Sequence, residues 1–226
     1  MEEELDFNPP YEDYSAIMNT LHILFDKITE WAEDNKSMGF PYVAARFGKK
    51  HGSKIRLSAE DDIDFIRNFH VAERINGISE AEKFYDSEEE LTELEVDVLE
   101  AIFDSFYGYF QVTKKADIGY TEVELSDMLS KKVYRCHNFN LCSVSSEGDL
   151  FFGRLVPFRD SHIVGGASVL YGKSDLKLLK SKFSLLKIKK PRLDTFDLCN
   201  IGQQYRFQSE FASFYKRKEN KLDFWI

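Results

Sequence analysis

The chain has few cysteines, and none of them forms a close pair with another. Cys136, Cys142 and Cys199 are the only three among 226 residues. An odd count without paired spacing argues against a disulfide framework. It predicts a reducing compartment, for which we take the cytoplasm as the location.

Long apolar runs are also missing. No stretch approaches the roughly 20 apolar residues that a membrane-spanning helix needs. The first six residues, MEEELD, are acidic, whereas a secretory signal begins with positive charge followed by an apolar run. We therefore expect a protein without a membrane span or a signal peptide.

Aromatic residues are abundant, with 20 Phe and 11 Tyr, although 43% hydrophobic and 31% charged residues are ordinary for a globular protein. A chain of this length buries roughly 70% of its unfolded surface. We expect a real core, with part of the aromatic surplus at an interface.

Charge reverses along the sequence. Residues 1–130 hold 30 Asp or Glu and 12 Lys or Arg, a net charge of −18. Residues 131–226 hold 9 Asp or Glu and 18 Lys or Arg, a net charge of +9. Each half attracts the opposite sign, on a partner or on the other half. The total of −9 hides this separation.

The acidic half reads as mostly helical. Helical spacing and capping boxes predict helices over about 12–34, from Ser58 to Gly77, from Ser79, from Ser87 through Phe110, and from Thr121 to Val133. A short basic hairpin is expected over 41–57. On the long fourth helix Phe103, Phe106, Tyr107 and Phe110 share the core face, which leaves Tyr109 for a partner contact.

The pattern changes from helical to extended near residue 134. Three apolar runs, 139–144, 150–158 and 163–171, are separated by short polar turns and predict an antiparallel meander. Further helices are expected after Ser174 and over 207–215. The predicted class is α+β: an acidic, mostly helical part (1–133) packed on or beside a β-meander with flanking C-terminal helices (134–226), as two units or one continuous domain.

One local pattern suggests metal-dependent chemistry. Gly52-Ser53 followed by Asp62-Ile63-Asp64 resembles the nucleotidyltransferase superfamily, in which a Gly-Ser turn holds nucleotide phosphates and two aspartates on a strand bind Mg²⁺. The resemblance implies Ser53, Asp62 and Asp64 as site residues, with Mg²⁺ and a nucleotide as cofactor and substrate. The interval is shorter than in that family, and Ser58 with Asp61 favours a capped helix, on which the aspartates diverge.

Cysteine and histidine fall close together around residue 140. Cys136, His137 and Cys142, with His162, are conceivable zinc ligands, but they lack the close pairs of zinc modules. Buried strand cysteines explain them better. His70 shares a helix face with Ile63 and Ile66 and is expected in the core. No metal ligand is assigned.

The tract from Lys173 to Arg192 carries eight Lys or Arg and one acidic residue. It is a candidate for binding nucleic acid, anionic membrane or an acidic protein surface. Pairing with the acidic half of the same chain is the competing interpretation. The candidate binding residues are Lys177, Lys180, Lys187, Lys189, Lys190 and Arg192, together with Tyr109.

The leading hypothesis is a non-catalytic interaction protein that recognises a macromolecular partner, most simply another protein, through its charge-split surfaces. The first alternative is a metal-dependent nucleotidyltransferase using Asp62 and Asp64. The second is nucleic-acid binding through the Lys173–Arg192 tract, which the acidic half disfavours by repulsion. A strand at residues 61–66 would favour the enzyme, and a helix would argue against it.

Overall fold

The computed structural model describes most of the first 171 residues and short parts of the remainder. The described residues are 10–37, 39–47, 49–51, 54–57, 60–75, 77–87, 90–116, 121–171, 177, 179–181, 195, 197–199 and 222–225.

Five helices come from the first 103 residues. They are α1 (Pro10–Asp34), α2 (Gly39–Phe47), α3 (Glu60–Ala72), α4 (Glu80–Ser87) and α5 (Glu93–Phe103). The predicted box at Ser79 caps α4, where Ser79 Oγ accepts from the backbone of Glu82 and the Glu82 carboxylate accepts from the Ser79 backbone. α5 is capped by a box of Thr92 and Glu95, and the start predicted for it at Ser87 is wrong, because Ser87 is the last residue of α4.

Helices α1, α4 and α5 pack on one another through a shared apolar cluster. Leu24 and Ile28 of α1 are fully buried with Leu99 and Ile102 of α5 and Phe84 of α4. These residues recur at helical spacing, as the sequence pattern requires for one buried face. None of the helices in the described ranges is long and apolar enough to cross a membrane.

Five strands form a closed barrel. They are β3 (Phe106–Lys115), β4 (Glu122–Asp127), β5 (Val133–His137), β6 (Leu150–Phe158) and β7 (Ser161–Tyr171), in the order β3-β4-β5-β7-β6. All neighbours are antiparallel except β5 and β7, which are parallel. Helix α6 (Phe139–Val144) lies between β5 and β6 in the chain. This is the topology of an OB-fold, a five-stranded Greek-key barrel.

The barrel interior is filled by side chains. Phe110 of β3, Leu125 of β4, Cys136 of β5 and Phe151 of β6 lie within one buried cluster, which Leu141 of α6 also joins. The alternating burial along β5 shows the period of two that this closure requires.

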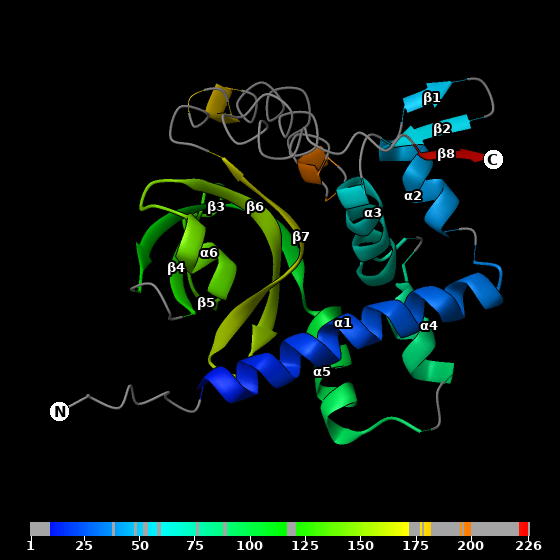
Figure 1. Ribbon diagram of the computed structural model, residues 1–226, viewed down its shortest axis with the longest axis horizontal. Coiled ribbons are helices and arrows are strands. Elements are labelled where there is room, and N and C mark those ends of the chain that lie inside the picture. Colours follow the sequence, from blue (N-terminus) through cyan, green and yellow to red (C-terminus); the bar gives the residue numbers. More distant parts are fainter. Residues whose placement is uncertain are drawn as a thin grey trace.

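A second, three-stranded sheet is built from distant parts of the chain. β1 (Lys49–His51) pairs with β2 (Lys54–Leu57), and β2 pairs with β8 (Leu222–Trp225), both antiparallel. Figure 1 shows this sheet beside α2, with α3 between it and the barrel, while α1 and α5 run along the opposite side of the molecule.

An aromatic cluster joins α2 and α3 to the barrel. Phe65 and Phe69 of α3 lie against Tyr107 of β3, with ring centroids 5.6 Å and 6.2 Å apart. Phe152 of β6 stacks on Tyr107 at 5.4 Å. Leu179, from the C-terminal region, is fully buried in the same cluster.

The α+β class is confirmed, with helices on both sides of the closed sheet. The strands expected over 150–158 and 163–171 are present as β6 and β7. The hairpin expected over 41–57 is confined to β1 and β2, because residues 39–47 form helix α2. The predicted three-stranded meander is confirmed only for β6 and β7, which pair antiparallel, because its first run, 139–144, is helix α6 and the sheet also contains a parallel β5–β7 pair.

Three element predictions around the barrel are wrong. The long helix expected to reach Phe110 ends at Phe103, and β3 follows. The helix expected over 121–133 is strand β4 with the start of β5, and the strand expected over 139–144 is helix α6. Extended structure therefore begins near residue 105 and not 134, and the barrel takes strands from both the acidic and the basic half.

Candidate functional site

The charge reversal in the sequence becomes a separation of charged elements in the fold. Residues 10–34 hold six Asp or Glu and residues 80–104 hold eleven, with Lys27 and Lys83 as their only Lys or Arg. Residues 39–57 hold five Lys or Arg and no Asp or Glu, and the barrel (106–171) holds seven of each sign. The helices α1, α4 and α5 thus carry the negative charge, next to a neutral barrel.

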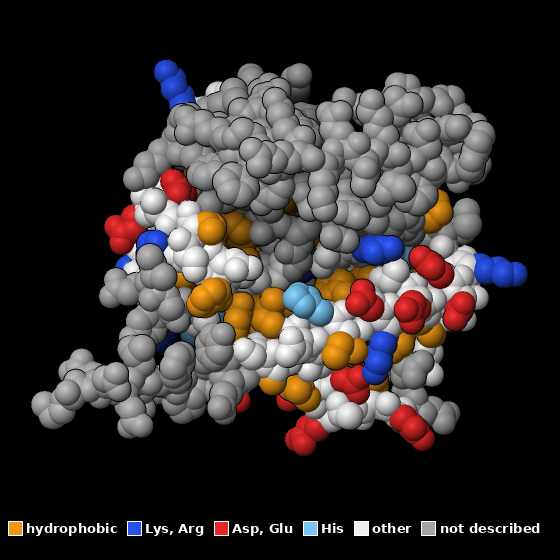
Figure 2. Space-filling model, in the orientation of Figure 1, with side chains coloured by type: hydrophobic (Ala, Val, Ile, Leu, Met, Phe, Trp, Pro, Cys, Tyr) orange, Lys and Arg blue, Asp and Glu red, His pale blue; other side chains and the backbone are white. Residues whose placement is uncertain are grey.

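We call the exposed carboxylates of these three helices the acidic face. It consists of Asp26, Glu30, Glu33 and Asp34 of α1, Asp86 of α4, and Glu93, Asp97 and Glu100 of α5. Figure 2 shows acidic side chains gathered over this part of the molecule with few Lys or Arg between them. Like charges that lie this close produce a field that attracts a cationic surface.

Two of the cations near the acidic face are paired with carboxylates. Lys27 of α1 binds Glu95 of α5 at 2.6 Å, and Arg74 binds Glu82 at 2.6 Å. The Lys27 and Arg74 contacts lower the pKa of Glu95 and of Glu82 to about 2, with help from capping hydrogen bonds. In the described part of the chain, the carboxylates of the acidic face make no ion pair.

The cationic elements lie on the other side of the molecule. In Figure 1 the β1–β2 sheet lies above α2, while α1, α4 and α5 lie in the lower part of the view; Leu179 of the Lys173–Arg192 tract is buried with α2, α3 and the barrel. Lys177 and Lys180 are exposed. Lys187, Lys189, Lys190 and Arg192 lie outside the described residues. The described lysines of the tract therefore lie apart from the acidic face.

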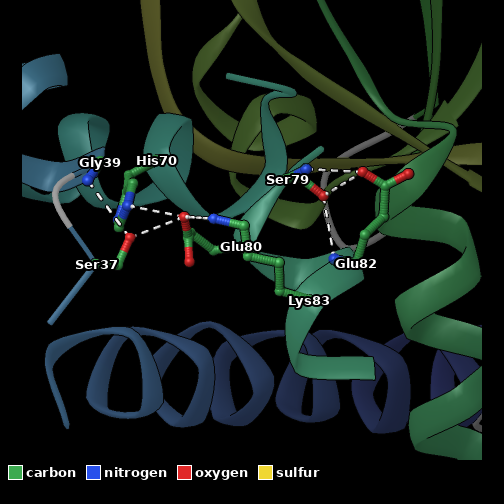
Figure 3. A network of polar contacts seen from close by, with 7 residues as sticks. All are labelled: Ser37, Gly39, His70, Ser79, Glu80, Glu82 and Lys83. Carbon is green, nitrogen blue, oxygen red and sulfur yellow. Dashed lines mark hydrogen bonds and ion pairs between the residues drawn. The ribbon is translucent and has the colours of Figure 1, made fainter. Parts of the chain in front are cut away.

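A buried polar cluster links the α1–α2 connection, α3 and α4 (Figure 3). Glu80 Oε1 accepts hydrogen bonds from Ser37 Oγ at 2.9 Å and from Lys83 Nζ at 2.7 Å, and it lies 3.7 Å from His70 Nε2. The His70 ring packs on Gly39, where an added Cβ would lie 2.2 Å from Nε2. His70 is 2% exposed and Glu80 6%. The expectation that His70 lies in the core is confirmed.

The cluster predicts a loss of stability in mild acid. Burial lowers the pKa of His70, an effect that Glu80 opposes. As pH falls below about 6.5, the unfolded chain takes up the proton first, so stability decreases toward the folded-state pKa. Urea unfolding at pH 7.5 and 5.5 checks this: the pH dependence is expected to be smaller in His70→Gln. Glu82 and Glu95 do not contribute in this window, because their shifts act below pH 4.5.

The aspartates of the enzyme alternative lie on a helix. Residues 60–72 form α3, so Asp62 and Asp64 lie on a helix, whereas the metal site requires two positions on one face of a strand. Ser53 lies outside the described residues. The geometry on which the nucleotidyltransferase resemblance depends is absent from this segment.

Tyr109 is not available for a partner. It is 1% exposed and lies on strand β3, where its ring centroid is 4.7 Å from that of Phe152, and its hydroxyl donates to the Leu198 carbonyl at 2.9 Å. The expectation of a surface tyrosine was wrong because it assumed a helical period where the chain is a strand.

The cysteine and histidine candidates have other partners. Cys136 is fully buried in the barrel, and Cys142 Sγ donates to the Glu122 carbonyl at 2.9 Å. His137 Nδ1 lies 3.0 Å from the Thr121 hydroxyl. Burial raises the pKa of both thiols. No group of three or more potential metal ligands occurs within the described ranges.

Comparison with protein families gives a match. The model of a family described as "Family of unknown function (DUF7986)" matches residues 10–197, which include all the helices and strands of the barrel and the acidic face. No curated protein and no solved structure matches.

Proposed function

The chain belongs to the family of unknown function DUF7986, and we propose that it is a non-catalytic interaction protein that docks a basic surface of a protein partner on its acidic face. The observation that carries the proposal is the set of exposed, unpaired carboxylates on α1, α4 and α5. Complementary charge of this kind speeds association and selects partners of opposite sign.

The helices that carry the acidic face pack on one another through buried side chains. α1 and α5 share a buried apolar seam, and the Lys27–Glu95 ion pair at 2.6 Å crosses between them. Exposed apolar side chains accompany the carboxylates, with Ile23 of α1 53% exposed and Leu94 of α5 38% exposed. An interface that combines such apolar contacts with charge fits a folded protein partner.

Capture of partners with matched variants tests the proposal. The immobilised wild type is compared with Glu30→Gln/Glu33→Gln, which neutralises two carboxylates of the acidic face. The control is Glu147→Gln/Asp160→Asn, which removes the same charge from exposed positions of the barrel. Bound proteins are quantified by mass spectrometry at about 50 mM and about 500 mM salt.

The expected result is a basic partner that the wild type and the barrel control retain at low salt. The acidic-face variant is expected to retain it at least about threefold less well, and high salt to release it. Equal retention by the two variants would contradict the proposal, because their net charges are identical and only the position of the charge differs.

A further inference from the structure

The barrel carries a groove on its outer surface, away from the acidic face. It has a volume of about 260 Å³ and is lined by Lys114, Lys115, Ala116, Glu122, Val123, Glu124 and Arg135. The groove runs across three neighbouring strands, β3, β4 and β5. In Figure 1, β4 lies on the edge of the barrel opposite α3 and α4.

The backbone register places the charged residues of the groove in one row. Lys114 of β3 is opposite Glu124 of β4, which is in turn opposite Arg135 of β5. Neighbouring strands are about 4.8 Å apart. The two cations therefore stand on either side of a carboxylate, within reach of one extended ligand.

Both carboxylates of the groove already accept hydrogen bonds. Glu124 accepts from the Thr113 hydroxyl at 2.6 Å, and Glu122 accepts from Arg135 Nε at 2.7 Å. Lys115 Nζ is held by the Cys142 carbonyl at 2.8 Å. Among the described residues, Lys114 makes no ion pair, and Arg135 uses only Nε. An exposed ammonium and the outer nitrogens of an exposed guanidinium are the donors that remain.

We propose that this groove binds the phosphates of single-stranded nucleic acid through Lys114 and Arg135. Arginine and lysine are the usual phosphate donors, and a guanidinium can bind phosphate with two nitrogens. In barrels of this strand order the outer face of the second and third strands, here β4 and β5, is suited to oligonucleotides. The site is distinct from the acidic face and does not depend on it.

The shape and the charge of the surroundings favour a single strand over a duplex. A groove of about 260 Å³ admits a phosphate and its sugar but not the width of a double helix. The barrel is electrically balanced, and the strongly acidic helices lie on its other side. A narrow ligand in the groove avoids the repulsion that a duplex would meet from these helices.

Fluorescence anisotropy with a fluorescein-labelled 15-nucleotide oligothymidylate tests the proposal. The wild type is expected to bind at low salt, with log affinity falling linearly with log salt concentration. Lys114→Ala/Arg135→Ala is expected to weaken binding at least about tenfold and to reduce the salt slope by about 1.4, which is two single-strand phosphate contacts. Both side chains are on the surface, so the fold is expected to persist.

Two further variants distinguish binding in the groove from binding to exposed lysines elsewhere and from damage to the barrel. Lys177→Ala/Lys180→Ala removes two exposed lysines outside the groove and is expected to bind within about twofold of the wild type. Glu122→Gln/Glu124→Gln removes repulsion and is expected to tighten binding by about threefold, an effect that mere damage to the barrel would not produce. The proposal is overturned if the wild type does not bind, or if the Lys114/Arg135 variant binds as tightly as the wild type. It is also overturned if the Lys177/Lys180 variant loses as much affinity as the Lys114/Arg135 variant, or if the Glu122/Glu124 variant gains none.

Discussion

Replacing Glu73 with alanine is expected to lower the free energy of unfolding by about 3–5 kcal/mol, because it leaves the buried charge of Arg154 uncompensated. Arg154 of β6 is fully buried, and it donates to Glu73, just after α3, at 2.5 Å and to the Ser105 hydroxyl at 2.7 Å. Its guanidinium lies over the Tyr107 ring at 4.3 Å. One ion pair thus ties the end of α3 to the barrel.

Urea unfolding of three variants checks the size and the origin of this effect. Glu73→Leu/Arg154→Met removes both charges and is expected to recover most of the stability lost in Glu73→Ala, since apolar replacements of a buried pair are often neutral. Lys27→Ala breaks the exposed Lys27–Glu95 pair and is expected to cost less than about 1 kcal/mol. A Glu73→Ala loss as small as that of Lys27→Ala would show that Arg154 is not held by this carboxylate.

The helical layer could be predicted from the sequence because each signal in it is local. Spacing of three and four residues indicates α1 and much of α5, and the Ser79–Glu82 box marks the start of α4, although the box expected at Ser87 does not begin α5. The first barrel strands could not be predicted in this way. Five of the eight residues 103–110 are aromatic, so a helical face and a strand buried on both sides fit the sequence equally well.

The partner strands decide between these structures. Residues 106–111 pair with 150–155 of β6, which lie 39 to 49 positions away in the chain, and this pairing places Tyr109 in the core. Likewise 122–126 pair with 133–137, which converts a capped, apparently helical segment into a hairpin. Tertiary pairing overrides local propensity in both places.

The candidate sites were only partly visible in the sequence. The acidic face could be predicted as a net charge, but its separation from the cationic elements depends on the fold. The groove was missed, because Lys114, Glu124 and Arg135 are far apart in the chain and meet only through the register of β3, β4 and β5. The spacing of a linear motif cannot identify residues that become neighbours only through strand pairing.

Truncating Phe152 to alanine is expected to destabilise the protein by about 3–5 kcal/mol, through lost burial and the cavity that remains. Phe152 is fully buried, and its ring lies 4.7 Å from Tyr109, 5.4 Å from Tyr107 and 6.4 Å from Phe65 of α3. It therefore fills the space between the barrel and the helical layer. Urea unfolding measures the loss.

Phe139→Ala supplies the matched control for the same measurement. Phe139 of α6 is 41% exposed, so its truncation removes the same atoms from a position where they fill little interior space. It is expected to change the free energy of unfolding by no more than about 0.5 kcal/mol. Comparable losses in the two variants would contradict the assignment of Phe152 to the joint between β6 and α3, because a cavity penalty requires neighbours that cannot close around the missing ring.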